Sequence, residues 1–264
     1  MRFFLLLCIL ALFFTCFWWS GGYTLTDTVT TRARQEWEEH LEAHPALAAT
    51  ANTLGKAYDS AYRLVALRSA VEDKLSKTHY AKLEQISLPL QQAVIAVEDT
   101  RFYTHMGVDP EGVLRAGLVN LQSGHIEEGG STITQQLVKN LFLTHEQSFG
   151  RKAEELALAL DMEARYTKEE ILELYLNTIY FGSGFTGITQ ASMGYFAKLP
   201  ADLTLAEAAL LAGLPNAPSL LSPYVDYEAA KRRQSIVLDR MVKCGYINPS
   251  LAQAAKKEPL ALAR

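Results

Sequence analysis

Residues 89–107 read PLQQAVIAVEDTRFYTHMG, and they combine a strongly apolar segment with an acidic turn. The apolar residues Leu90, Ala93, Val94 and Val97 recur at three- and four-residue steps, which predicts a helix with one buried face. Pro89 stands at the start, where the first turn of a helix tolerates proline. The stretch therefore predicts a core helix that ends at the pair Glu98-Asp99.

The position of Glu98 at a helix end indicates chemistry. The negative end of the helix dipole disfavours a carboxylate, so we expect Glu98 to bind its proton more tightly than usual. A carboxyl group with that property suits a general base or acid that works near neutral pH. These residues alone also allow a plain surface ion pair of Glu98 or Asp99 with Arg101 or Arg115.

The remainder of the chain also favours helices over strands. Capping-box sequences at Thr167–Glu170 and Thr204–Glu207 each precede an apolar run, and the second run, rich in alanine and leucine, reads as a buried helix. Further helices are expected at Arg151–Arg165 and, as the last one, at Tyr227–Cys244. Loops are expected at 123–134 and 182–187. Strand patterns are scarce, so the predicted fold class is mainly α.

The N-terminus carries a hydrophobic run. Residues Phe3 to Trp19 are apolar except for Thr15, and seventeen residues just suffice for a helix to cross a hydrocarbon core of about 30 Å. A retained transmembrane anchor is therefore expected. Two alternatives fit less well: Ser20-Gly21-Gly22 is a poor signal-peptide cleavage site, and a lipoprotein signal would need a small residue where Thr15 precedes Cys16.

Overall charge and cysteine content exclude some classes. The 264 residues carry a formal net charge of −4, which argues against a nucleic-acid-binding protein. Three cysteines in no regular spacing indicate neither a disulfide framework nor a metal cluster. His40 and His44 lie one helical turn apart, but a solvated helix face explains them better than a zinc site.

A second stretch, GGSTITQQLVKN at 129–140, favours anion binding. Its two glycines let the backbone approach a ligand closely, and the hydroxyl and amide residues that follow begin a helix whose positive end suits a phosphate or pyrophosphate. Lys139 lies one to two turns into that helix and could reach the same anion. An ordinary capped helix with a polar face is the alternative.

A third stretch, RKAEE at 151–155, places Arg151 and Glu155 four residues apart on one helix face. Taken alone, it is best explained as a routine ion pair.

These stretches, in this order, resemble the peptidoglycan glycosyltransferases of family 51, which occur as stand-alone enzymes and as domains of bifunctional penicillin-binding proteins. The resemblance runs from about Tyr80 to Met241. Besides the three stretches, a fourth motif begins at Lys168 and includes Tyr175, Asn177 and Tyr180, and a fifth contains Arg233.

The resemblance implies a lysozyme-like helical domain with a small membrane-proximal lobe, and the apolar run at 3–19 adds the expected N-terminal transmembrane helix. The expected parts are a signal anchor at 1–20, a linker and membrane-proximal helical segment at 21–78, and the glycosyltransferase domain at 79–264. No transpeptidase domain is expected. The expected location is the bacterial inner membrane, with a single pass and the catalytic domain on the outer, periplasmic side.

The resemblance also implies roles for individual residues. Glu98 would take the proton from the 4-hydroxyl of the acceptor sugar, and Glu155 would organise the donor, while undecaprenyl diphosphate leaves with inversion. Lys139, Arg151 and Lys152 would stabilise the leaving diphosphate. The other expected substrate-binding residues are Ser131, Thr132, Gln135, Gln136, Asn140, Asp99, Phe102, His105 and Tyr180.

The implied partners are lipid II, the growing glycan strand, the membrane, and other cell-wall synthesis and division proteins. A divalent cation, Mg²⁺ or Mn²⁺, is a candidate cofactor, although no ligand cluster in the sequence shows one. One departure stands out: the family commonly has an arginine where this chain has Gln147. Two rival functions stay open, a lysozyme-like glycan-cleaving enzyme and an inactive membrane-anchored cell-wall scaffold.

Overall fold

The computed structural model describes residues 66–75, 78–123, 129–143 and 149–263, all of which belong to one compact unit of the chain. These residues form helices and contain no strand, which confirms the mainly α prediction. In chain order the α-helices are α4 (Leu67–Glu72), α5 (Leu88–Glu98), α6 (Pro110–Ser123), α7 (Ile133–Phe142), α8 (Phe149–Arg165), α9 (Lys168–Thr178), α10 (Ile188–Phe196), α11 (Leu205–Gly213), α12 (Pro218–Leu221), α13 (Tyr227–Lys243) and α14 (Pro249–Lys257).

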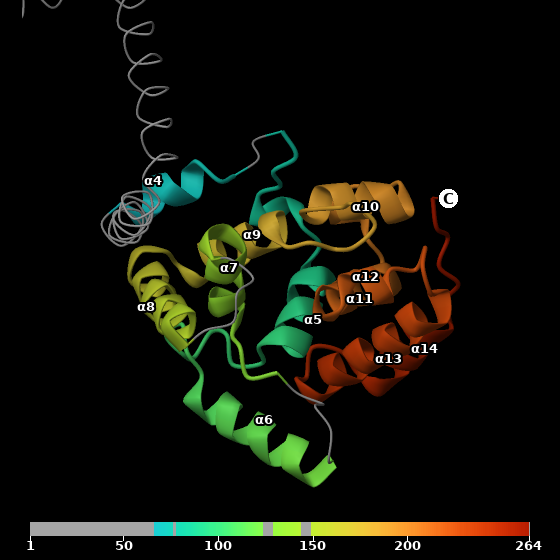
Figure 1. Cartoon of the computed structure of the whole chain (residues 1–264). Coiled ribbons are helices and arrows are strands. Elements are labelled where there is room, and N and C mark those ends of the chain that lie inside the picture. The colour runs from blue at the N-terminus through green and yellow to red at the C-terminus, as the bar shows by residue number, and fades with distance from the viewer. Residues whose placement is uncertain (1–65, 76–77, 124–128, 144–148, 264) are drawn as a thin grey trace, which may run out of the picture. The chain divides into compact units, whose positions relative to one another are not determined.

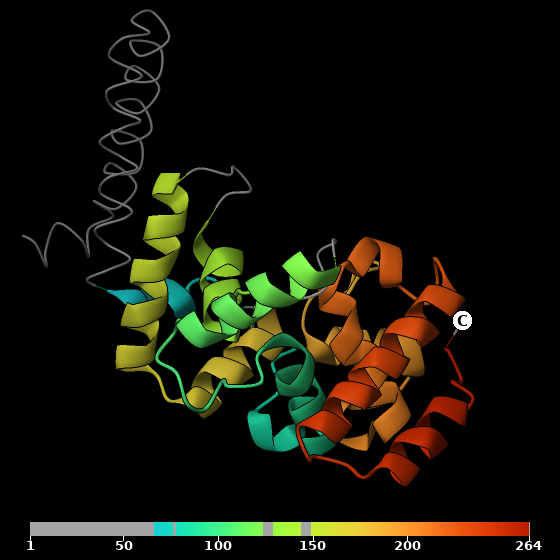
Figure 2. The ribbon, with the colours of Figure 1, turned by 90° about the horizontal axis from the view of Figure 1, so that it is seen from below.

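Helix α5 lies at the centre of the described unit. It packs against α11 and α13, while α7 packs against both α8 and α9. Figures 1 and 2 show α5 between the α7–α9 group on one side and the α11–α14 group on the other. Because Glu98 is the last residue of α5, the fold presents it where these two groups of helices meet.

Local capping signals explain where several helices begin. Reciprocal capping boxes join Thr167 to Glu170 before α9 and Thr204 to Glu207 before α11, which confirms both predicted starts. Helix α13 ends one residue before the predicted Cys244 and is not the last helix. Gly245 turns the chain with φ of 75°, and Asn248 caps the additional helix α14.

The predicted anchor at 1–20 and most of the predicted segment at 21–78 lie outside the described residues. Helix α4 is part of that segment, and its residues Leu67 and Val71 belong to the same hydrophobic core as the buried residues of α5 to α13. Within the described ranges, no helix has both the length and the apolar character that crossing a membrane requires. Gln147 also lies outside the described residues.

Candidate active site

The two carboxylate oxygens of Glu98 have different surroundings among the described residues. Its Oε2 atom accepts a hydrogen bond of 2.8 Å from the side-chain amide of Gln136 in α7. Its Oε1 atom is buried and has no hydrogen-bond partner among the described residues. A buried carboxylate oxygen without a partner is costly, so such an atom is a candidate for contact with a ligand. The alternative of a plain surface ion pair does not describe Asp99, whose buried carboxylate contacts His105.

The pKa of Glu98 is raised, as the sequence predicts, but for a different main reason. Burial is the largest cause, because it disfavours the ionised form. The hydrogen bond from Gln136 and the positive charges of Arg233 and Lys139 act in the opposite direction, and the charge of Asp99 adds to the rise. The structure thus places Lys139 near enough to Glu98 for the lysine charge to act on it.

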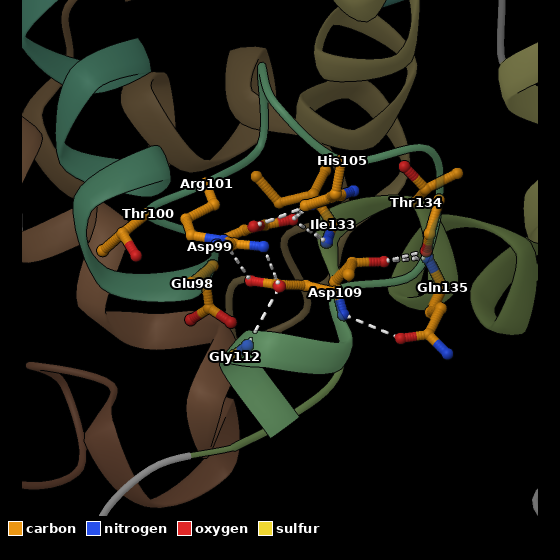
Figure 3. A network of polar contacts seen from close by, with 12 residues as sticks. Glu98, Asp99, Thr100, Arg101, His105, Asp109, Gly112, Ile133, Thr134 and Gln135 are labelled. Carbon is orange, nitrogen blue, oxygen red and sulfur yellow. Dashed lines mark hydrogen bonds and ion pairs between the residues drawn. The ribbon is translucent and has the colours of Figure 1, made fainter. Parts of the chain in front are cut away.

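Asp99 and His105 form a buried pair that supports the start of α7. The Asp99 and His105 side chains are 2% and 3% exposed, and Nε2 of His105 lies 3.0 and 2.9 Å from the two carboxylate oxygens. The backbone N–H of Ile133, the first residue of α7, donates to Asp99 at 3.0 Å. Figure 3 shows these contacts and shows the neighbouring carboxylates of Glu98 and Asp99 pointing in different directions. Asp99 therefore holds α7, and with it Gln136, against the end of α5.

An ion pair closes the turn that follows α5. Arg101 contacts Asp109 with hydrogen bonds of 2.8 and 3.2 Å and also pairs with Glu111. Asp109 in turn accepts a hydrogen bond of 2.9 Å from the N–H of Gly112 at the start of α6. Burial would raise the pKa of Asp109, but the hydrogen bonds from Gly112 and Arg101 lower it below its usual range.

Gly107 occupies a position where only glycine fits. Its φ is 77°, and a Cβ atom there would lie 2.9 Å from the backbone oxygen of Ala159 in α8. Its own carbonyl accepts a hydrogen bond of 2.6 Å from the hydroxyl of Thr132, the residue that caps α7. The turn after α5 therefore runs directly along α8 and is tied to α7.

Gly107→Ala is expected to destabilise the fold, because the left-handed backbone alone costs about 1–3 kcal/mol and the clash adds to it. Urea unfolding of the full chain measures the loss. Gly245→Ala is the matched control, since Gly245 has a φ of 75° but open space around it. Equal losses in the two variants would contradict the close approach to α8.

Glu155 is a buried carboxylate held between two cations of its own helix. It is 3% exposed, Nη1 of Arg151 lies 3.3 Å from its Oε2, and Nζ of Lys152 contacts its Oε1. The predicted pairing along α8 is therefore present, with Lys152 added to it. This arrangement concentrates one negative and two positive groups at the start of α8.

A further ion pair joins α7, α8 and α9. Glu163 of α8 accepts hydrogen bonds from the hydroxyl of Thr134 at 2.6 Å and from Lys168 at 2.8 Å. The Lys168 ammonium lies 4.6 Å from the centre of the buried Phe102 ring. Phe102 is thus packed under a cation, at the junction of the three helices.

The remaining predicted residues fall into two groups. Thr132 and Gln135 are buried and form the capping box of α7, with hydrogen bonds of 2.9 and 3.1 Å. Ser131, Lys139 and Asn140 are exposed. Tyr180 is also exposed, and its hydroxyl accepts a hydrogen bond of 3.1 Å from the N–H of Gly184. The assignment of these residues to substrate stays a prediction.

Two residues near Glu98 were not among the predicted site residues, although both belong to motifs noted in the sequence. Tyr175 of α9 donates a hydrogen bond of 3.2 Å to the carbonyl oxygen of the Gln136 side chain. Arg233 of α13 acts on the charge of Glu98 and donates to the carbonyl of Gly213 at 3.3 Å. The motifs contain both residues, but their spacing does not show that Tyr175 reaches Glu98 through Gln136 or that the charge of Arg233 acts on Glu98.

The predicted divalent cation calls for a group of ligand side chains in the described part of the chain. No group of three or more His, Cys, Asp or Glu side chains there is placed to hold a metal ion. Use of Mg²⁺ or Mn²⁺ stays a prediction, and no step below depends on it.

Comparison with known proteins gives consistent matches. A family model described as Transglycosylase matches residues 66–242. Penicillin-binding protein 1A of Aquifex aeolicus is 45% identical over 186 residues, which are 70% of this chain and 26% of that protein. The proteins of the same name from Vibrio cholerae and Escherichia coli are each 47% identical, over 68% and 67% of this chain and 22% and 21% of their own.

The chain therefore spans about a quarter of the length of the curated relatives that it matches. Among solved structures, the 2.6 Å crystal structure of penicillin-binding protein 1A from Haemophilus influenzae matches at 32% identity with a TM-score of 0.35. That match covers 50% of this chain and 16% of the other.

Proposed function

Because this chain belongs to the transglycosylase family, we propose that it polymerises lipid II into peptidoglycan glycan strands, with Glu98 as the general base. The observation that carries this proposal is the buried Oε1 atom of Glu98, which has no hydrogen-bond partner in the part of the chain that the structure describes. A carboxylate in that state can accept the proton of a sugar hydroxyl, which contributes ~10²–10⁴-fold to the rate of such reactions. The proposed location is the outer face of the inner membrane, supported by the apolar run at 3–19.

The proposed reaction is an inverting transfer. The acceptor 4-hydroxyl gives its proton to Glu98, and its oxygen forms a bond to the anomeric carbon of the growing strand. The bond from that carbon to undecaprenyl diphosphate breaks, and the diphosphate leaves with the electron pair. Since negative charge grows on the leaving group, the reaction needs fixed cations more than a strong acid.

Three cations are suited to this task. Lys139 is exposed on α7, in the same helix as Gln136, which contacts Glu98. Arg151 and Lys152 extend from the start of α8, where Glu155 pairs with both. We propose that Glu155 holds these two side chains ready for the diphosphate. The lysozyme-like fold and the small membrane-proximal lobe are part of the same proposal, which the helical architecture supports.

Incubation of the purified full chain with lipid II tests the proposed function. Glycan polymer together with free undecaprenyl diphosphate is the expected product. Cleavage of added glycan strands would instead favour the glycan-cleaving enzyme, because a carboxyl group with a raised pKa also suits a general acid. Absence of both products would favour the scaffold.

Lys139→Ala is expected to lower kcat/KM for lipid II by about 10–100-fold, since hydrogen bonds to charged groups contribute on the order of 1.5–3 kcal/mol. Steady-state kinetics of polymerisation measure the change. Lys139→Arg keeps the charge and should recover part of the loss, while Lys243→Ala, an exposed lysine at the end of α13, serves as the matched control. Equal rates in the Lys139→Ala and Lys243→Ala variants would remove Lys139 from the donor site.

A further inference from the structure

Tyr175 is the far end of a chain of hydrogen bonds that reaches Glu98. The phenol is completely buried on α9, and its hydroxyl donates to Oε1 of Gln136 at 3.2 Å. The amide nitrogen of the same Gln136 side chain donates to Oε2 of Glu98 at 2.8 Å. Three helices, α9, α7 and α5, thus contribute one residue each to a single line of polar contacts.

The hydroxyl of Tyr175 favours one of the two possible orientations of the Gln136 side-chain amide. A glutamine amide has a donor side and an acceptor side, and turning it by 180° exchanges them. If the Gln136 amide turned, its carbonyl would face the ionised carboxylate of Glu98, and the buried Tyr175 proton would lose its acceptor. Both changes are unfavourable, because a buried donor without a partner and two facing acceptors each cost free energy.

We propose that Tyr175 is a positioning residue that fixes the Gln136 amide with its NH₂ group toward Glu98. The inference rests on the proposed function of Glu98 as the base. In this arrangement Tyr175 acts through Gln136 and never contacts the substrate.

The surroundings of Glu98 show why this orientation matters. Burial raises the pKa of Glu98, and the Gln136 hydrogen bond is the largest influence that lowers it. The charged groups that act on Glu98 are Arg233 from α13, Lys139 from α7 and the adjacent Asp99. Helix α11 also packs against α5, but its Glu207 is paired with Lys198.

Tyr175 itself stays a donor throughout the working range of pH. Burial raises the pKa of its hydroxyl well above the usual value, and the charges of Glu98 and Asp99 raise it further. Without that hydroxyl, the Gln136 amide is free to turn its carbonyl toward protonated Glu98 and accept the proton. The ionised form of Glu98 then loses the hydrogen bond from Gln136 that stabilises it relative to the protonated form.

Tyr175→Phe in the full chain tests this inference. The titration midpoint of the Glu98 carboxyl carbon, followed by ¹³C NMR and identified by its absence in Glu98→Gln, is expected to rise by about one pH unit. The rate of lipid II polymerisation should fall about tenfold at pH values below the wild-type Glu98 midpoint. At pH values well above the midpoint of the variant, the rate should change less than about twofold.

Tyr195→Phe is the matched control. Tyr195 is equally buried, and its hydroxyl bonds to the carbonyl of Phe181 and to Ser222, at 3.0 and 3.1 Å. This variant loses a buried hydroxyl as well, but its Glu98 midpoint should stay at the wild-type value. The double variant Tyr175→Phe/Gln136→Ala should shift the midpoint no further than Gln136→Ala alone, because both changes remove the same contact.

The outcomes separate this inference from the proposed function. An unchanged Glu98 midpoint in Tyr175→Phe, or an equal shift in Tyr195→Phe, overturns the role of Tyr175 even if the wild-type chain makes polymer. Conversely, a raised midpoint in Tyr175→Phe alone supports the positioning role, and failure of the wild-type chain to make polymer would then count against the proposed function only.

Discussion

Replacement of Glu98 by glutamine is expected to lower the rate of lipid II polymerisation by ~10²–10⁴-fold, the usual contribution of a positioned general base. Glutamine has nearly the same shape, but it cannot take the proton of the acceptor hydroxyl. Binding of lipid II should be largely retained, so the loss should appear in kcat rather than in KM. Steady-state polymerisation kinetics measure both quantities.

The same variant should not be less stable than the wild type. The pKa of Glu98 is raised in the folded chain, so folding favours the protonated form of this residue. Stability therefore falls as pH rises from the unfolded pKa to the folded pKa, and at neutral pH the ionised group disfavours the fold. A neutral glutamine removes that penalty, as is common when an active-site charge is replaced.

Glu84→Gln is the matched control, because Glu84 is an exposed glutamate outside the site. This control should retain both activity and thermal stability. Polymerisation by Glu98→Gln at the rate of Glu84→Gln would mean that Glu98 is not the base.

Replacement of Asp99 by alanine is expected to destabilise the chain by about 3–5 kcal/mol, because two buried donors lose their acceptor and each such loss costs on the order of 1–3 kcal/mol. His105 would be left buried without its partner, and the N–H of Ile133 at the start of α7 would lose its acceptor. For a domain of this size, that loss lowers the thermal midpoint by roughly 6–20 °C. Thermal unfolding followed by circular dichroism measures it.

The double variant Asp99→Ala/His105→Ala provides the control. If the two side chains act as a pair, His105→Ala lowers the stability of the Asp99→Ala variant by less than it lowers the stability of the wild type, because its partner is already absent. Additive losses would show that the two residues stabilise the fold independently. Activity should fall in Asp99→Ala as well, but together with stability, which distinguishes it from Glu98→Gln.

Those features of the fold that depend on neighbouring residues could be predicted from the sequence. The capping boxes at Thr167 and Thr204 need only residues three positions apart, and both helices begin where predicted. Helix α10 had no such signal: Gly187 precedes it, and Ala197, a residue that rarely adopts a positive φ, ends it at 52°. Helix α14 begins at Asn248 and Pro249, a pair of residues that is equally typical of a turn, so the local pattern alone does not predict a helix there.

The candidate site could be predicted only in part, for a similar reason. The position of Glu98 at the end of α5 and the pairing of Arg151 with Glu155 follow from local spacing. The contact of Asp99 with Ile133 joins residues 34 positions apart, and that of Tyr175 with Gln136 joins residues 39 apart. Contacts of this kind depend on how α5, α7 and α9 pack, which local patterns do not specify.

The cause of the raised pKa of Glu98 shows the same distinction. The sequence suggested the helix dipole, which acts within one helix. The structure shows burial as the largest cause, and this burial arises where α5 meets helices that are distant in the sequence. The predicted direction was confirmed, and burial is a cause that the end of a single helix does not reveal.

The most direct test compares two pH dependences in the wild-type chain. One is the titration of the Glu98 carboxyl carbon by ¹³C NMR, and the other is kcat/KM for lipid II, which reports the ionisation of the free enzyme. If ionised Glu98 is the base, the acidic limb of kcat/KM coincides with the Glu98 midpoint, and both lie above the usual range for glutamate. A rate that stays constant while Glu98 changes from protonated to ionised would contradict this account.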